Sequence, residues 1–294
     1  RKPPMAKIPK AVIPAAGLGT RVLPATKSIP KEMLPIVDKP AIHYIVEECV
    51  RSGITDILII TSRGKASMED YFDRSPELEE RLRASGKEAL YREMVEISQM
   101  ANIQYLRQKE TKGLGHAVLQ AKAFAAGDPI AVLYGDDVVI SPPGKEAIGE
   151  LAAAYETYGL GVVGIKEVTP QQILSYSSLA VTPLADRVFK VTDMIEKPAP
   201  DKVLSLYSIL GRCVLPNEIF DILEATPPGA GGEIQLTDAM KVLTLQKGMT
   251  GVNYTGKRYD MGSKLGVLQA IVEVGLSHPE IGENFRDYLK GLTL

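Results

Sequence analysis

The stretch KAVIPAAGLGTRVLPATKSIPKEMLPIVDKP, residues 10–40, decides how the rest of the chain can be understood. Residues 11–14 form a short apolar run that predicts a buried strand, and a glycine-containing turn follows at once. Glycines let backbone N–H groups approach phosphate oxygens, while Arg21 and Lys31 add two positive charges. The stretch is therefore typical of a site for a nucleoside triphosphate.

The spacing of this glycine turn narrows the class of site, because a Gly-x-Gly pair alone is equally typical of an ordinary strand-to-helix turn. A dinucleotide fingerprint requires a third glycine that opens a helix, whereas Val22 stands there and Pro24 follows. The Gly-x-x-x-x-Gly-Lys-Ser/Thr pattern of a P-loop does not occur in the chain. A Rossmann dehydrogenase and a Walker-type NTPase are both disfavoured.

Strand-like and helix-like segments alternate along the first half of the chain. Strands are predicted at residues 11–14, 56–61, 103–107 and 130–134, a helix at 41–51 with Gly53 as its C-cap, and an inserted helical pair at 76–100. This βαβ order predicts an α/β fold with a parallel sheet, whose ligands bind at the carboxyl ends of the strands. The second half is expected to add mixed strands and a carboxyl-terminal helical region.

The composition is that of a soluble enzyme. A net charge of −2 over 294 residues disfavours nucleic-acid binding, and Cys49 and Cys213 are too few for a disulfide framework or a four-cysteine zinc site. Both are expected to be buried free thiols. No apolar stretch reaches the length of a signal peptide or a membrane span, so we expect no membrane contact and a cytoplasmic location. Met5 is a candidate native start, with residues 1–4 foreign to the chain.

Carboxylates stand where a Mg²⁺ ion would be bound. Asp136 and Asp137 directly follow the predicted strand 130–134, and Asp260 lies in the segment Arg-Tyr-Asp-Met-Gly. Magnesium in nucleotide sites takes one or two carboxylates together with phosphate oxygens and water. The alternative for each aspartate is a strand-end turn or a helix cap.

Four segments together resemble one known family. They are the loop AAGLGTR with PATKSIPKEMLPIVDKP, then RQKETKGLGHAV (residues 107–118), EKP (196–198) and TPPGAGGEIQLTDAM (226–240). These resemble the sugar-1-phosphate nucleotidyltransferases, and among them the bacterial UTP–glucose-1-phosphate uridylyltransferases, over residues 10–289. The resemblance implies a Rossmann-like three-layer nucleotidyltransferase fold with a central mixed, mostly parallel sheet. We expect a single domain over 5–294, with a nucleotide-binding half (about 10–140), a sugar-phosphate half (about 141–260) and a helical tail (about 261–294).

The resemblance also implies roles for individual residues. It places Arg21 and Lys31 on the triphosphate, Lys197 on the incoming phosphate, and Mg²⁺ on Asp136, rather than Asp137, together with Asp260. The expected nucleotide-binding residues are Ala16, Gly17, Gly19, Thr20, Gln108, Gly113 and Gly115. The expected sugar-binding residues are Glu196, Glu233 and Tyr176.

Several of these residues also have an ordinary structural explanation. GLGHA at 113–117 is equally typical of a glycine-opened helix start, and His116 is expected to pack or cap rather than bind a ligand. An exposed Glu-Lys-Pro at a strand end is unremarkable by itself. Thr237 or Asp238 is expected to cap the helix that follows.

The reaction that the resemblance implies is attack of glucose-1-phosphate on the α-phosphorus of UTP, which gives UDP-glucose and pyrophosphate with Mg²⁺ as cofactor. The resemblance also favours a homo-oligomer, a dimer or a tetramer. The attacking phosphate is already ionised, so positioning and charge neutralisation should dominate catalysis. The alternatives are transfer from dTTP or to another hexose-1-phosphate, and a noncatalytic nucleotide-sugar sensor.

Departures from the family pattern concentrate on the sugar side. Residues 175–178 read Ser-Tyr-Ser-Ser where the family often has Ser-x-Tyr-Gly, and Leu206 stands where an asparagine is common. Ser62 replaces a common glycine in the segment 61–65, and Ser263 follows Gly262 where Asp or Asn is usual. Because loss of a hydrogen-bonding group can change selectivity strongly, the hexose is less defined by the sequence than the uridylyl transfer.

Overall fold

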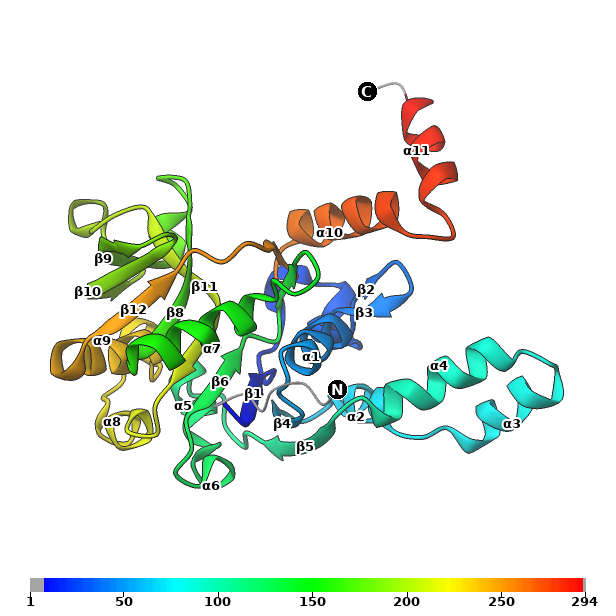
Figure 1. The fold of residues 1–294 in the computed structure, drawn as a ribbon, viewed down its shortest axis with the longest axis horizontal. Coiled ribbons are helices and arrows are strands. Elements are labelled where there is room, and N and C mark those ends of the chain that lie inside the picture. Colours follow the sequence, from blue (N-terminus) through cyan, green and yellow to red (C-terminus); the bar gives the residue numbers. More distant parts are fainter. Residues whose placement is uncertain (1–7, 293–294) are drawn as a thin grey trace.

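A nine-stranded sheet forms the centre of the computed structural model, which describes residues 8–292 (Figure 1). The expected start at Met5 and the four residues before it lie outside this range. The strand order is β5-β4-β1-β6-β11-β8-β12-β10-β9. The strands of this sheet are β1 (Lys10–Pro14), β4 (Asp56–Thr61), β5 (Asn102–Arg107), β6 (Ile130–Leu133), β8 (Gly161–Glu167), β9 (Ser177–Ala185), β10 (Val188–Glu196), β11 (Tyr207–Leu215) and β12 (Met249–Val252).

The strand directions confirm a mixed, mostly parallel sheet. β5, β4, β1 and β6 pair in parallel, as the alternation along the first half predicts. β11 pairs antiparallel with β6 and β8, and β10 pairs antiparallel with β12 and β9, so only these two strands run against the others. Two small ladders flank the sheet: β2 (Pro35–Ile36) with β3 (Lys39–Pro40), and β7 (Asp137–Ile140) with β13 (Lys257–Asp260).

Helices cover both faces of the sheet, which gives three layers. The α-helices are α1 (Ala41–Arg51), α2 (Ala66–Phe72), α3 (Pro76–Ala84), α4 (Glu88–Gln99), α5 (Leu114–Leu119), α6 (Lys122–Ala125), α7 (Ala147–Tyr158), α8 (Ile219–Ala225), α9 (Leu236–Lys247), α10 (Lys264–Ser277) and α11 (Gly282–Lys290). Helices α1 and α7 pack in one apolar cluster, and α5, α8 and α9 pack in a second.

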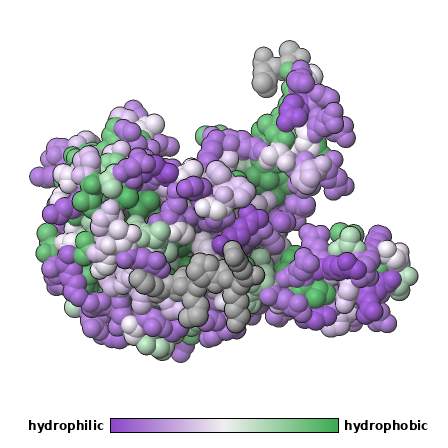
Figure 2. All heavy atoms as spheres, viewed as in Figure 1, coloured by the Kyte–Doolittle hydropathy of each residue, from purple (hydrophilic) through white to green (hydrophobic). Residues whose placement is uncertain are grey.

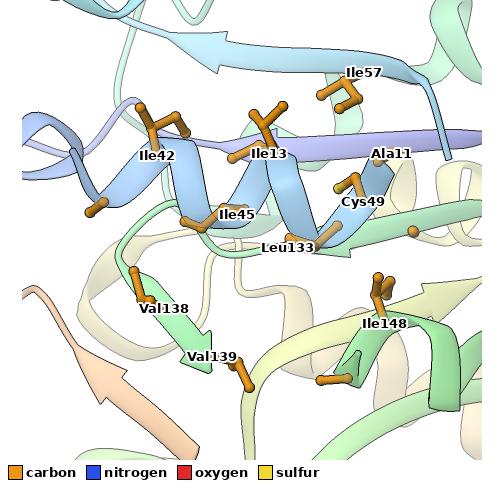
Figure 3. Packing of buried hydrophobic residues seen from close by; sticks show 14 of the residues in the cluster. Ala11, Ile13, Ile42, Ile45, Cys49, Ile57, Leu133, Val138, Val139 and Ile148 are labelled. Carbon is orange, nitrogen blue, oxygen red and sulfur yellow. The ribbon is translucent and has the colours of Figure 1, made fainter. Parts of the chain in front are cut away.

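The alternation of side chains along β1 explains the two clusters. Successive side chains of a strand point to opposite faces, so Ala11 and Ile13 join the cluster of α1 whereas Val12 joins the other. Figure 3 shows the first face, where Ile42 and Ile45 of α1 lie beside Ile13. Because β1 is covered on both faces, it reads as a continuous apolar run.

Two helical extensions leave the sheet. The predicted helical pair is confirmed as α3 and α4, which project to one side, while α10 and α11 form the expected carboxyl-terminal helical region (Figure 1). Apolar residues appear among polar ones on both extensions (Figure 2). Cys49 and Cys213 are buried and free, as expected. Within residues 8–292, none of the helices has the length and apolar character needed to cross a membrane.

Candidate functional site

A cavity of about 560 Å³ opens beyond the carboxyl ends of β1 and β6 and reaches across to the end of β10. This is the edge where an α/β sheet places its ligands. Its lining comes from eight separate parts of the chain, and most of the lining residues are polar or charged. The lining residues are Arg21, Leu114, Tyr134, Asp136, Asp137, Leu174, Ser175, Tyr176, Ser177, Glu196, Lys197, Ile209, Leu210, Gln235, Thr237, Arg258 and Asp260.

The loop after β1 brings the two predicted triphosphate cations to the cavity edge. Gly19 has a φ of 66°, which favours glycine, and its carbonyl accepts a hydrogen bond of 2.7 Å from Thr26 Oγ1. Arg21 follows with 62% of its side chain exposed, so its guanidinium is available to a ligand. Lys31 begins the short 3₁₀ turn η3 (Lys31–Met33), and its Nζ lies 3.6 Å from the place where a Cβ on Gly17 would be.

Lys31 and Asp136 form a close ion pair, with Nζ 2.5 Å from Oδ2. Burial opposes the charge on Asp136, but Lys31, together with Arg258 and Arg21, lowers the pKa of Asp136 below its usual value. Burial likewise opposes the charge on Lys31, yet attraction to Asp136 and Glu32 raises its pKa. Both groups are therefore charged at neutral pH. The structure pairs Lys31, which is predicted to bind the triphosphate, directly with Asp136, which is predicted to bind the metal.

Arg258 is a cavity cation that the sequence reasoning missed. Its Nη2 lies 2.5 Å from Oδ1 of Asp137 and 3.8 Å from Oδ2 of Asp260, and its Nη1 donates to Tyr176 Oη at 3.3 Å. Burial raises the pKa of Asp137 to about 6, with repulsion from Asp136 and Asp260 adding to it against the pull of Arg258. The sequence did contain a signal for Arg258. Residues two apart in a strand such as β13 share a face, and Asp260 is a predicted metal ligand.

The two predicted metal ligands converge on Gly262. A Cβ placed on this glycine would lie 2.9 Å from Oδ1 of Asp260, 3.0 Å from Oδ2 of Asp136 and 2.5 Å from Nη2 of Arg21. Only a residue without a side chain leaves room there. Two carboxylates that face one small space beside a cavity fit a divalent cation that takes its remaining ligands from phosphate and water. No cluster of three or more His, Cys, Asp or Glu suited to a metal occurs within residues 8–292.

Three of the predicted nucleotide-binding residues, Gln108, Gly113 and Gly115, make close contacts within the fold. Gln108 is buried, and its Nε2 lies 2.7 Å from Nδ1 of His116 and donates to the Gly113 carbonyl at 3.4 Å. A Cβ on Gly113, whose φ is 99°, would lie 2.7 Å from Cβ of Glu233, and one on Gly115 would lie 2.7 Å from the Ile234 carbonyl. The close approach of residues 233 and 234 therefore explains both glycines within the fold. Their contact with a nucleotide stays a prediction. His116 contacts Gln108 here, and its expected structural role also stays a prediction.

Glu196, a predicted sugar-binding residue, is held by Thr237, which was expected to cap a helix. Thr237 Oγ1 donates a hydrogen bond of 2.7 Å to Glu196 Oε2, and burial raises the pKa of Glu196. The expectation that Thr237 or Asp238 caps helix α9 is wrong, because α9 begins at Leu236 with Gln235 in the cap position and no side-chain cap bond. Both residues already lie within the first turn, so Thr237 can face the cavity.

Lys197 adopts an uncommon backbone conformation at the end of β10. Its φ is 46°, and its N–H donates to the Tyr176 carbonyl at 2.9 Å. Left-handed backbone at a residue other than glycine persists only where the surroundings impose it, and such residues cluster at functional sites. Tyr176 also donates through Oη to Asp260 Oδ2 at 3.3 Å, so it contacts a predicted metal ligand as well as the backbone of Lys197.

The serines that replace the family pattern serve the fold. Ser178 Oγ donates to the Ser205 carbonyl at 2.8 Å and accepts from the Leu204 N–H at 2.9 Å, while Ser177 Oγ accepts from the Ile209 N–H at 3.1 Å. Ser177 therefore connects β9 to β11, and Ser178 connects β9 to the loop that precedes β11. Leu206, a departure that bears on hexose selectivity, and Glu233, a predicted sugar-binding residue, are not among the cavity-lining residues. Glu233 is exposed.

Comparison with known proteins defines the class to which this fold and site belong. The model of the nucleotidyl transferase family matches residues 10–275, and the chain belongs to that family. A UTP–glucose-1-phosphate uridylyltransferase of Bacillus subtilis (strain 168) is 50% identical over 284 residues, which are 97% of this chain and 95% of that protein. A second one, from Staphylococcus saprophyticus, is 46% identical over 99% of this chain and all of that protein.

Solved structures give the same assignment. The fold is similar to a UTP-bound UDP-glucose pyrophosphorylase from Acinetobacter baumannii, with a TM-score of 0.90 and 39% identity over 97% of this chain and 100% of that chain. A UDP-glucose pyrophosphorylase complexed with UDP-glucose matches with a TM-score of 0.83 and 39% identity over 91% of this chain and 98% of that one. The resemblance and the fold class expected from the sequence are confirmed.

Proposed function

We propose that this chain transfers the uridylyl group of UTP to glucose-1-phosphate and releases UDP-glucose and pyrophosphate. The observation that carries the proposal is the single cavity that gathers Arg21, Asp136, Glu196, Lys197 and Asp260 from distant parts of the sequence. Cations and carboxylates suited to phosphates lie at one end, and the half-buried carboxylate of Glu196, suited to hydroxyl groups, lies at the other. Relatives named UTP–glucose-1-phosphate uridylyltransferase match nearly the whole chain, which supports this reaction.

The chemistry needs no side-chain nucleophile. A sugar phosphate is ionised at neutral pH and attacks the α-phosphorus in line with the departing pyrophosphate, so the protein must align two anions and offset their repulsion. In the proposal, Arg21 and Lys31 hold the triphosphate and Lys197 holds the attacking phosphate. The N–H groups of the loop at 16–20 add hydrogen bonds to the triphosphate.

Asp136 and Asp260 would hold the Mg²⁺ ion, which supplies positive charge to phosphate oxygens when bound. Tyr176 and Arg258 orient Asp260 through the contacts described above. Glu196, with one carboxylate oxygen fixed by Thr237, would accept hydrogen bonds from sugar hydroxyls through the other. Gln108, Gly113 and Gly115 would meet the uracil base. The predicted nucleotide-binding and sugar-phosphate halves, a homo-oligomeric assembly and a cytoplasmic location complete the proposal.

The direct test measures pyrophosphate release with Mg²⁺ for UTP, dTTP and other triphosphates against glucose-1-phosphate and related hexose phosphates. Release mainly from UTP with glucose-1-phosphate is the expected result. Preference for dTTP or another hexose phosphate would change the substrate while keeping the transfer chemistry. Tight UDP-glucose binding without any release would instead indicate a noncatalytic sensor.

A further inference from the structure

The glycine loop after β1 is fastened from behind by the segment that follows β4. Ser62 Oγ donates a hydrogen bond of 2.9 Å to the Ala16 carbonyl, and Lys65 Nζ donates to the Ala15 carbonyl. Both donors lie just after the carboxyl end of β4, the parallel neighbour of β1. Two consecutive carbonyl groups of the loop are therefore held from one side. Ser62 stands where the family commonly has glycine, and this chain therefore has an additional hydroxyl contact.

These contacts orient the predicted phosphate-binding amides. In a trans peptide unit, the C=O and the next residue's N–H point in opposite directions. Holding the carbonyls of Ala15 and Ala16 toward Ser62 and Lys65 therefore turns the N–H groups of Ala16 and Gly17 to the opposite side. Preorganised N–H groups bind an anion without the ordering that a free loop would require.

The same ammonium fastens the second basic turn. Lys65 Nζ lies 2.9 Å from Oε2 of Glu32, which is fully buried and directly follows Lys31 in η3. Among the described residues, Oε1 of Glu32 has no hydrogen-bond partner. One buried charge therefore joins three segments that meet around the triphosphate site.

This ion pair is a poor device for stability alone. Burial raises the pKa of Glu32 and lowers that of Lys65 even though the two groups attract each other. Both shifts disfavour the charged forms, as expected when desolvation exceeds the Coulombic gain. A buried ion pair of this kind is weak evidence for a role in stability, and the contacts of Lys65 with two segments point to a role in geometry.

We propose that Lys65, assisted by Ser62, is a positioning residue that holds the Ala15–Gly17 backbone and the Lys31 turn in the geometry that binds the triphosphate. The inference rests on the proposed function for the identity of the nucleotide. It predicts a selective defect: affinity for UTP falls while affinity for the sugar phosphate, whose residues lie at the far end of the cavity, does not change.

The decisive variant is E32Q/K65M in the full chain, because it removes both buried charges together and so leaves neither charge without its counter-ion. We expect thermal unfolding within a few degrees of wild type, a rise in KM for UTP of about tenfold or more, and a KM for glucose-1-phosphate within about twofold of wild type. Ser62→Gly should raise KM for UTP by about threefold. A stable double variant with an unchanged KM for UTP, or one that shifts both KM values equally, would overturn the proposal.

Lys10 provides a matched control at the opposite end of β1. Its Nζ also bonds a backbone carbonyl, that of Ala125, and a carboxylate, that of Asp128. Lys10→Met should leave both KM values unchanged. Calorimetric titration with UTP and Mg²⁺ separates this proposal from the function: wild-type protein without turnover would reject the proposed function, while a tenfold weaker Kd for UTP in E32Q/K65M would still support the positioning role, and an equal Kd would refute it.

Discussion

The two ends of the cavity are held by different kinds of contact. At the proposed nucleotide end, ammonium groups pair with carboxylates, as in Lys31 with Asp136 and Lys65 with Glu32. At the proposed sugar end, neutral hydroxyls such as those of Ser177 and Ser178 connect β9 to β11 and to the loop before it. Charged hydrogen bonds are the stronger kind, and breaking one leaves a charge without a partner. Substitution of one partner alone should therefore be tolerated less well at the proposed nucleotide end than at the proposed sugar end.

The largest expected effect is on stability, at Arg258, which lies between the two ends. Arg258→Met leaves the buried Asp137 without its cation and should lower the free energy of unfolding by about 3–5 kcal/mol. Because the folded pKa of Asp137, about 6, exceeds the usual 3.8, its contribution is present below about pH 4 and is lost as pH rises through about 6. Without Arg258 the pKa rises further. Urea unfolding should therefore show a larger deficit at about pH 8 than at about pH 5; an equal deficit would contradict this account.

The next effect is on turnover at the nucleotide end. Lys31→Ala and Asp136→Ala should each reduce kcat/KM by about a hundredfold or more, because each removes a group that stabilises the phosphates during transfer. Circular dichroism and thermal unfolding serve as the control for folding. Near-normal pyrophosphate release from either folded variant would reject its assigned role and weaken the contrast between the two ends.

A smaller effect should mark the sugar end. Thr237→Val removes the hydroxyl that fixes Glu196 while keeping the shape of the side chain, so KM for glucose-1-phosphate should rise about fivefold to tenfold with KM for UTP unchanged. Thr237→Ser keeps the hydroxyl and should restore wild-type kinetics. If the serine variant behaves like the valine variant, packing rather than hydrogen bonding is responsible.

The smallest effect should occur at Leu206. Although the sequence comparison singled it out as a candidate for hexose selectivity, it does not line the cavity. Leu206→Asn should change the ratio of kcat/KM for glucose-1-phosphate to that for other hexose phosphates by less than about twofold. A tenfold change in this ratio would show that a residue outside the cavity lining influences hexose selectivity.

The agreement between sequence and structure follows how local each feature is. Helix α1 coincides with the predicted residues 41–51 and strand β4 with 56–61, because apolar periodicity and a glycine C-cap act within one segment. The confirmed position of Asp136 after β6 depends only on the place where one strand ends. Thr237 was misplaced because its partner, Glu196, is remote in sequence and its hydroxyl is equally suited to a cap.

The sequence by itself determined the family, the α/β alternation and the chemical types of the groups around the cavity, since these depend on ordered motifs and on the period of apolar residues. The tertiary structure alone decided that Arg258 lies between Asp137 and Asp260, that Glu32 and Lys65 are buried against the glycine loop, and that the serines at 177 and 178 face inward. Such contacts join segments far apart in the chain. Their strength depends on burial and distance, which exist only once the sheet and its helices have assembled.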